Sequence, residues 1–245
     1  MRVSIRFSPD GSLIGARNDE EMAQMLRVVG MQYAGGGYSS VIGAFGGQMV
    51  STITCQACGQ RSQCHDAFLD LSLPIPAHKH VKEADRQRVS CALSECFEEF
   101  TAQEMLEGDD MYYCDHCRGR SRASKQLLLV QAPPVLVVHI KRFCHSPSAR
   151  EKLTTDLDFP ETGLDLGPFM AHGMPAPDLY DLKAVALHVG GMGGGHYHAL
   201  CLKSDDRAWY SCNDSTVRPA SLHTLDRSQP YILFYHNRAA PAVVC

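Results

Sequence analysis

A glycine run followed at once by a histidine is the stretch whose residue types are best suited to catalysis. Residues 193–195 are all glycine and precede His196. Glycine has no Cβ and tolerates a positive φ angle, so such a run lets the backbone approach a ligand closely. The pair Asn213-Asp214 follows after a turn at residues 204–206 and a short aromatic strand. This order predicts a hairpin that sets an imidazole beside a side-chain acceptor, which together are two of the three groups of a nucleophilic triad.

Two cysteine pairs have the spacing of metal ligands. The four residues are Cys55, Cys58, Cys114 and Cys117. Two residues separate the cysteines of each pair, so both sulfurs can face one point, and two such pairs complete a tetrahedral Zn(Cys)4 site. Four thiolates leave no open coordination position, so we expect one structural zinc per chain. The alternatives are metal-free, buried thiols and substitution of a ligand by Cys64, His65 or His116.

Helical spacing is found mainly in the first half of the chain. Apolar residues recur every three or four positions over residues 19–29 and 89–100, which predicts two amphipathic helices. A capping box at residues 101–104 predicts a further short helix that Gly108 ends. Residues 34–48 are rich in glycine and are predicted to form a loop.

Strand patterns dominate the second half. Apolar runs or alternation predict strands over residues 68–75, 126–130, 135–140, 180–189 and 231–235. The prolines of residues 145–179 predict a loop with short strand pieces. Strands that follow helices in this way predict an α+β fold with a mostly antiparallel sheet.

Composition excludes several classes of protein. The 245 residues are 44% hydrophobic and 20% charged, as expected of a folded globular chain, and the net charge is only -4. Because no long basic stretch is present, we expect no nucleic-acid partner. The N-terminal residues contain neither a secretory signal nor a membrane span, so we expect no membrane partner. Eleven cysteines without such a signal favour a reducing compartment, cytoplasmic or nuclear rather than secreted.

The cysteine pairs belong to a longer series of motifs that resembles the ubiquitin-specific protease family. The matching stretches are residues 45–48, 51–58, 100–108, 113–117, 123–125, 134–143, 152–153, 159–160, 164–166, 188, 195–197, 209–217 and 231–235. They include a strand similar to the family's Leu-Lys-Arg-Phe strand and a Gly-His-Tyr box. The resemblance covers roughly residues 43–236, and the motifs agree in order and spacing.

The resemblance implies a papain-like cysteine protease fold with fingers, palm and thumb. The protease domain would span residues 43–240, with the fingers at about 43–130 and the palm at about 125–240. Residues 1–42 would be an N-terminal remnant, a helix and loop like part of a thumb that is otherwise largely missing.

The resemblance also implies the activity, hydrolysis of the bond after the C-terminal glycine of ubiquitin. Ubiquitin and ubiquitinated proteins are the implied partners, and a cysteine thiolate is the implied nucleophile. By motif position His196 would be the general base, Asn213 would orient its ring, and Asp214 would lie beside them in the site. The implied channel for the tail of ubiquitin is formed by Gly193, Gly194, Gly195 and Tyr197.

The sequence departs from the family at the nucleophile. The family's cysteine box, Gly-Asn-Thr-Cys-Tyr, lies well ahead of the fingers and is absent here. We therefore expect a deubiquitinase chain that is truncated and inactive alone, since the thioester chemistry needs a positioned thiolate. The alternative is an inactive pseudoenzyme that still binds ubiquitin, and a weaker one is a zinc-stabilised scaffold for other partners.

Overall fold

The computed structural model describes residues 40–81, 88–145, 150–191 and 193–240, which form two compact units. The first comprises the described parts of Met1–Leu69, Thr101–Pro133 and Gly167–Ala176. The second comprises those of Asp70–Phe100, Pro134–Leu166 and Pro177–Cys245. The predicted helix over residues 19–29 lies outside the described residues.

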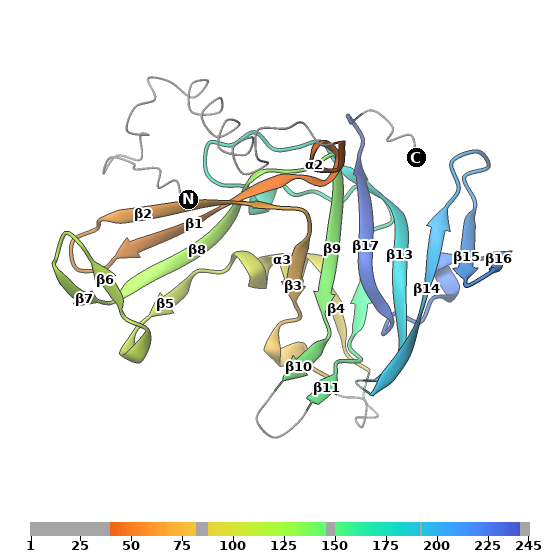
Figure 1. The fold of residues 1–245 in the computed structure, drawn as a ribbon, viewed down its shortest axis with the longest axis horizontal. Helices are drawn as coiled ribbons and strands as arrows, with labels where there is room; N and C mark the ends of the chain where they lie inside the picture. The colour runs from red at the N-terminus through yellow and green to blue at the C-terminus, as the bar shows by residue number, and fades with distance from the viewer. Residues whose placement is uncertain (1–39, 82–87, 146–149, 192, 241–245) are drawn as a thin grey trace. The chain divides into compact units, whose positions relative to one another are not determined.

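The first unit is built on a four-stranded sheet in the order β2-β1-β8-β5, antiparallel throughout (Figure 1). Its strands are β1 (Gly47–Cys55), β2 (Arg61–Phe68), β5 (Glu104–Leu106) and β8 (Ala123–Gln131). A separate hairpin consists of β6 (Tyr112–Cys114) and β7 (Gly119–Ser121). The short helices of this unit are α2 (Ser40–Phe45), η2 (Gly108–Asp110) and η3 (Gly167–Phe169).

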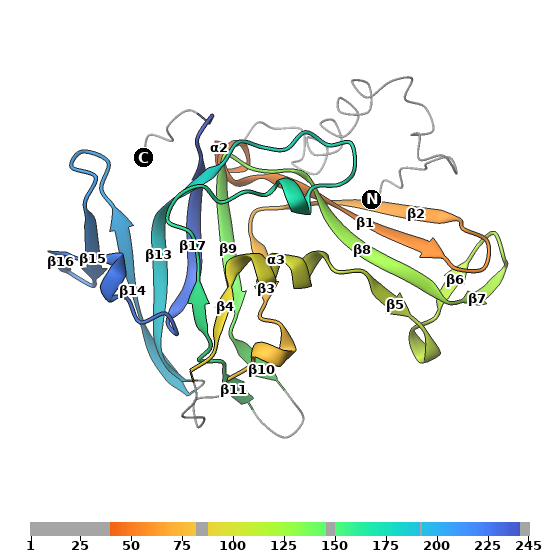
Figure 2. The same cartoon turned by 180° about the vertical axis from the view of Figure 1, so that it is seen from behind.

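The second unit contains a seven-stranded sheet in the order β16-β15-β14-β13-β17-β9-β3 (Figure 2). Its strands are β3 (Leu71–Pro74), β9 (Val135–Lys141), β13 (Tyr180–Gly191), β14 (Gly194–Leu202), β15 (Trp209–Asn213), β16 (Thr216–Pro219) and β17 (Pro230–Asn237). All neighbours are antiparallel except β3 and β9. Two small pairs accompany it, β10 (Phe143–His145) with β11 (Arg150–Lys152), and β4 (Ser90–Ala92) with β12 (Asp156–Asp158). The helices are η1 (Ala77–Lys79), α3 (Leu93–Thr101) and η4 (Leu222–Thr224).

The core of the second unit is the apolar face of its central strands. Leu136, Val138 and Ile140 alternate along β9 and are each fully buried. Leu93 and Phe97 of α3 are buried as well, four residues apart on one face of that helix. The alternation that predicts these strands therefore identifies their buried face.

The predicted α+β class with a mostly antiparallel sheet is confirmed, and so are the long apolar strands. The strands predicted over residues 126–130, 135–140, 180–189 and 231–235 correspond to β8, β9, β13 and β17. Among the described residues, no helix combines the length and apolar composition needed to cross a bilayer.

The short helix predicted after the capping box at residues 101–104 is wrong. Residues 104–106 instead form β5, which pairs with β8, and Glu104 and Lys125 form an ion pair of 2.7 Å across the two strands. A helix of one or two turns is marginal by itself, so strand pairing outweighs it. The predicted loop over residues 34–48 is also wrong in its described part, which contains α2 and the start of β1. There a Cβ on Gly47 would lie 2.2 Å from the ring of Phe68, so any larger residue would displace that buried ring.

Two other boundaries differ from those predicted. The apolar pattern over residues 68–75 is divided between β2 and β3, and the polar sequence of β2 gave no strand signal. The helix expected from residue 89 begins at Leu93 because residues 90–92 pair with β12. Residues 70–100 belong to the second unit, in which β3 pairs with β9.

A fully buried arginine joins the segments around the start of β17. The guanidinium of Arg142 donates hydrogen bonds to four backbone carbonyls, those of Pro230 (2.6 Å), Thr155 (2.8 Å), Leu153 (3.2 Å) and Arg227 (3.3 Å). Burial lowers the pKa of Arg142 to about 10, which leaves it charged at neutral pH. The cation thereby holds the segment after β11 and the loop before β17 to β9.

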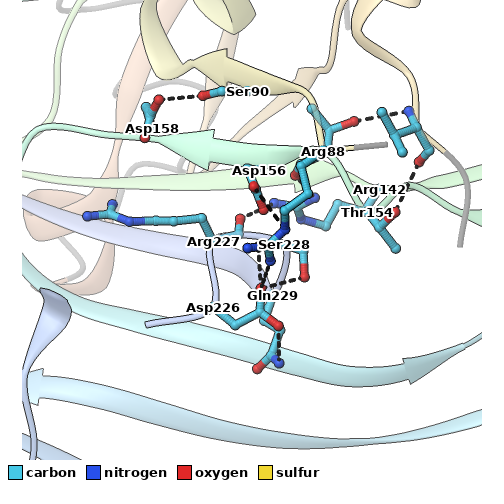
Figure 3. Close-up of polar contacts among 12 residues, drawn as sticks. Arg88, Ser90, Arg142, Thr154, Asp156, Asp158, Asp226, Arg227, Ser228 and Gln229 are labelled. Atoms are coloured by element: carbon cyan, nitrogen blue, oxygen red, sulfur yellow. Dashed lines mark hydrogen bonds and ion pairs between the residues drawn. The ribbon is translucent and has the colours of Figure 1, made fainter. Parts of the chain in front are cut away.

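Asp226, a residue of the loop before β17, stabilises that loop further through hydrogen bonds (Figure 3). One carboxylate oxygen of Asp226 accepts the backbone N–H of Ser228 (3.1 Å), and the other accepts the side-chain amide of Gln229 (3.0 Å). Arg88 pairs with Asp226 (3.3 Å) and with Asp156 (3.4 Å). Arg88 is exposed, so these ion pairs contribute little stability compared with Arg142.

We expect Arg142→Met to lower the free energy of unfolding of the second unit by at least about 3 kcal/mol. Each buried carbonyl left without a donor costs roughly 1–3 kcal/mol. The carbonyls of Pro230, Leu153 and Thr155 would lose the Arg142 donor, whereas that of Arg227 keeps the N–H of Leu157 (2.9 Å). Urea unfolding followed by the fluorescence of Trp209, the single tryptophan, reports on this unit. The exposed neighbour provides a control, Lys141→Met, which is expected to change stability by less than about 0.5 kcal/mol. Equal stability of the two variants would contradict the role of Arg142.

Candidate functional site

The glycine run is part of a hairpin rather than a loop. Residues 194 and 195 begin β14 and pair with residues 191 and 190 of β13. The next pair along the hairpin is Val189 with His196, so the histidine follows the glycine run within a regular strand. His196 therefore lies on a strand directly after the glycine run.

The two strands approach each other closely at this end. A Cβ on Gly195 would lie 2.1 Å from Nε2 of His188, and a Cβ on Gly190 would lie 2.6 Å from the carbonyl oxygen of Gly194. Gly190 also has a φ of 108°, which side chains rarely adopt. By contrast, nothing lies within 4 Å of a Cβ on Gly193. Glycine is therefore required at residues 190 and 195 by the packing of the hairpin itself.

His196 is hydrogen-bonded to Asn213. Nε2 of His196 lies 2.6 Å from Oδ1 of Asn213, which is the last residue of β15. An amide oxygen can only accept, so Nε2 carries the hydrogen and Nδ1 keeps its lone pair. Within the described residues Nδ1 makes no hydrogen bond. The distance lies within the ordinary hydrogen-bond range of about 2.6–3.2 Å.

Asp214 lies beside this pair. A carboxylate oxygen of Asp214 is 3.9 Å from Nε2 of His196, and the side chain is 81% exposed. Asp214 has a φ of 49° in the two-residue turn between β15 and β16, a conformation that aspartate tolerates better than most residues. Its interaction with a charged imidazole is long and screened by solvent, so Asn213 provides the main orientation of the ring.

A second histidine shares this strand. The rings of His196 and His198 are nearly parallel, with centroids 6.4 Å apart, as expected for alternate residues of one strand. Burial, and then the proximity of His196, lower the pKa of His198. His198 is therefore neutral at pH 7 and adds a polar group, not a charge, beside His196.

The opposite side of the hairpin carries a group of packed aromatic rings. Tyr197 packs on His188 with ring centroids 4.7 Å apart, and Tyr231 lies 5.9 Å from Tyr197. Phe143 and His139 each pack against Tyr231 as well, at 5.8 and 4.6 Å. Tyr231 is the extra residue of a bulge in the pairing of β13 with β17, and only the strand register reveals this.

No described cysteine sulfur is hydrogen-bonded to His196. Cys201 and Cys212 are nearest in sequence, on β14 and β15. Burial, and then Cys212, raise the pKa of the Cys201 thiol, which makes it a poor nucleophile. Cys91 and Cys96 are both fully buried, with sulfurs 3.7 Å apart. The described residues thus contain the histidine and its orienting amide without a paired thiol.

The four predicted metal ligands come together in the first unit. The sulfurs of Cys55, Cys58, Cys114 and Cys117 all lie within 4.8 Å of one another. This is the group of four among the described residues that could hold a metal ion, and it joins the turn after β1 to the turn between β6 and β7. The proposed substitute Cys64 lies in β2 with its sulfur near Asp66 (3.9 Å), outside this group.

The thiols of this group cannot all ionise by themselves. A hydrogen bond from the backbone N–H of Cys58 is the main cause that lowers the pKa of Cys55 to about 6. The neighbouring thiol of Cys58 is the main cause that raises the pKa of Cys117 to about 12. One thiolate thus suppresses the next, and a bound cation would remove this repulsion. The donor set therefore fits a metal that prefers sulfur ligands.

Comparison with known sequences gives a family for the chain. The model of the family described as "Ubiquitin carboxyl-terminal hydrolase" matches residues 22–235. Ubiquitin carboxyl-terminal hydrolase 21 of Rattus norvegicus is 38% identical over 203 residues, which are 83% of this chain and 34% of that protein. Ubiquitin carboxyl-terminal hydrolase 2 of Homo sapiens is 37% identical over 225 residues, 92% of this chain and 35% of that protein. The chain therefore spans about a third of the length of these curated relatives.

Solved structures show the same fold. A chain of the SAGA DUB module that contains Ubp8, bound to monoubiquitin, matches with a TM-score of 0.68 and 30% identity. The match covers 92% of this chain and 49% of that one. A second SAGA module, bound to ubiquitin aldehyde, matches with a TM-score of 0.69 and 28% identity over 92% and 50% of the two chains.

We expect the imidazoles of His188 and His198 to titrate below 6.5, their ordinary value, in the folded protein. Burial is the first cause for both, and Lys152 is the second cause for His188. The unfolded chain then binds more protons below pH 6.5, so stability is complete above this pH and falls as the pH drops toward the folded pKa. NMR titration of the ring protons measures the midpoints, and a midpoint at or above 6.5 would refute the assignment.

Proposed function

Because this chain belongs to the ubiquitin carboxyl-terminal hydrolase family, we propose that it carries the histidine half of a cysteine-dependent deubiquitinase site. The reaction is hydrolysis of the bond that follows the C-terminal glycine of ubiquitin. The observation that carries the proposal is the 2.6 Å contact between His196 and Asn213 beside the glycine hairpin. We assign the first unit to the fingers of the fold and the second to its palm.

In this proposal His196 is the general base and Asn213 sets its tautomer. Nε2 carries the hydrogen that Asn213 accepts, so the lone pair on Nδ1 can take the proton of a thiol. The thiolate then adds to the glycine carbonyl, and the imidazolium returns the proton to the departing amine. This leaves a thioester between the thiol and the C-terminal glycine of ubiquitin. Water then hydrolyses it, and His196 takes a proton from the water and returns it to the departing thiolate. An amide suffices as the third group because a thiol needs less activation than an alcohol.

The glycine hairpin is proposed to bind the extended tail of ubiquitin, which ends in two glycines. Residues 193–195 and the ring of Tyr197 are exposed, and the buried His188 packs against the ring of Tyr197. A channel lined by backbone admits a peptide without side chains and excludes larger ones. The glycines would then select the tail, and His196, next on the strand, would meet its carbonyl.

We propose none of the described cysteines as the nucleophile. Cys201 has a raised pKa, and Cys55, Cys58, Cys114 and Cys117 form the metal group. We propose that this chain alone is inactive. The second candidate, a pseudoenzyme that binds ubiquitin without hydrolysis, is favoured by the absence of a described thiol paired with His196.

Zinc is the metal proposed for the first unit. Bonds of about 2.3 Å from a tetrahedral zinc to four thiolates place neighbouring sulfurs about 3.8 Å apart. The sulfurs of Cys58 and Cys114 are 3.7 Å apart, and those of Cys55 and Cys117 are 3.9 Å apart. The four cysteines would be the only ligands of this zinc. The bound zinc would then be a structural crosslink between the two turns.

Ubiquitin and ubiquitinated proteins are the proposed partners. Ubiquitin is bound in the SAGA modules that this chain resembles, which supports the first of these. We propose a cytoplasmic or nuclear location, where thiols stay reduced and free to bind zinc.

We expect about one zinc per chain in protein purified without chelator. Structural zinc contributes on the order of 10–16 kcal/mol of apparent binding energy at neutral pH. Loss of two ligands in the double variant Cys55→Ser, Cys114→Ser should remove the metal and the amide protection of β1 and β6. The control Cys64→Ser alters a cysteine outside the metal group and should keep both. Wild-type protein that contains no zinc would refute the site.

We expect the purified chain to bind ubiquitin but not to hydrolyse a fluorogenic ubiquitin C-terminal amide. Gly195→Ala should weaken binding by roughly tenfold or more, about 1.4 kcal/mol, because the added Cβ would displace His188 and distort the hairpin. Gly193→Ala tests the channel itself: a Cβ there meets nothing within 4 Å in the chain, so a loss of affinity in this variant would come from a clash with the bound tail and not from a distorted hairpin. Calorimetry or fluorescence polarisation measures both affinities.

The outcomes separate the candidates. Turnover that a single Cys→Ser change and His196→Ala both abolish would identify a nucleophile in this chain and overturn its proposed inactivity. No turnover together with ubiquitin binding fits both the proposed half-site and the pseudoenzyme. Addition of a segment that carries the family's cysteine box distinguishes these two, because only a competent His196 would then restore hydrolysis. Absence of ubiquitin binding would refute both.

A further inference from the structure

The end of the β13–β14 hairpin lacks a partner strand on one side. The pairing of β13 with β17 ends at Leu187 and Pro230, and the N–H of His188 makes the last contact, with the carbonyl of Gln229 (3.1 Å). Pro230 has no N–H, and the N–H of Gln229 is used within its own turn, on the carbonyl of Asp226. The β13 carbonyls beyond Leu187 on this side therefore have no donor from β17.

A buried lysine supplies the missing donors. Nζ of Lys152 lies 2.6 Å from the carbonyl oxygen of His188 and 3.0 Å from that of Gly190. Lys152 is only 7% exposed and lies at the end of β11, where it pairs with Phe143 of β10. One ammonium group thus binds two alternate carbonyls at the edge of β13, as the N–H groups of a neighbouring strand would.

The bound segment is the one that pairs with the candidate site. Val189 and Gly190 of β13 lie opposite His196 and Gly195 of β14. Gly190 and Gly195 lie opposite each other and are both required to be glycine, so this end has no cross-strand side-chain pair at that position. Its position depends on backbone hydrogen bonds, and on the outer edge of β13 these come from Lys152.

We propose that Lys152 is a positioning residue for the site: its ammonium fixes the glycine end of the hairpin and so holds His196 against Asn213. The inference rests on the proposed function of the His196 pair and adds the residue that keeps it in register. Lys152 acts through the backbone of β13, so its removal should loosen residues 189–191 and 194–196 and leave the rest of the sheet in place. The fold of the hairpin end can then be measured separately from ubiquitin binding.

The test compares Lys152→Met, which keeps the length of the side chain without the charge, with Lys152→Arg, which keeps donors. Lys183→Met is the control, because Lys183 is an exposed residue of β13, the strand whose carbonyls Lys152 binds. Hydrogen exchange should accelerate at least about tenfold at residues 189–191 and 194–196 in Lys152→Met and remain unchanged at Val185 and Leu233 in the core. Lys152→Arg should restore most of the protection, and Lys183→Met should match the wild type.

A second readout follows the site itself. The Nε2 proton of His196, held by Asn213, should exchange faster with solvent in Lys152→Met, and ubiquitin affinity should fall with it. Unchanged exchange at the hairpin end would overturn the proposal, and so would an equal loss of protection at Val185 and Leu233, which would make Lys152 a general stabiliser. If the wild-type chain binds no ubiquitin, the proposed function fails, while the two exchange measurements still decide the role of Lys152.

Discussion

Buried cations that bind backbone carbonyls are the interactions on which the second unit depends. Arg142 donates to four carbonyls and Lys152 to two, at places where strand pairing ends. A charged donor costs free energy to bury, and several carbonyl acceptors offset that cost. A backbone hydrogen bond connects the two cations: the N–H of Leu153, the residue after Lys152, donates to the carbonyl oxygen of Arg142 (2.6 Å).

This arrangement explains how an exposed site can be ordered. His196 on β14 and Asn213 on β15 are both exposed to solvent, so little side-chain packing holds them. Their geometry comes instead from the register of β13, β14 and β15. Close glycine contacts fix the β13–β14 hairpin, and Lys152 binds two carbonyls of β13. A site on regular strands is held more precisely than one on a loop.

The first unit is organised on a different basis. Its strand β2 is largely exposed, and the sheet has few fully buried side chains at the end that carries the cysteines. Four sulfurs that converge from two distant turns can replace a hydrophobic core there, provided that they bind a metal. The two units thus use different means, a metal crosslink and buried cations, to order segments that hydrophobic packing leaves unfixed.

The sequence by itself determined the long strands, the class of fold, the cysteine group and the pairing of His196 with Asn213. Each is encoded locally, by alternation, by a two-residue spacer, or by motifs whose order reflects a family. The tertiary structure alone decided that residues 104–106 form a strand, that Gly195 packs on His188, and that Lys152 replaces a strand partner. These depend on contacts between residues far apart in the chain, where a neighbouring strand or carbonyl outweighs local preference, and no spacing within a single segment can specify them.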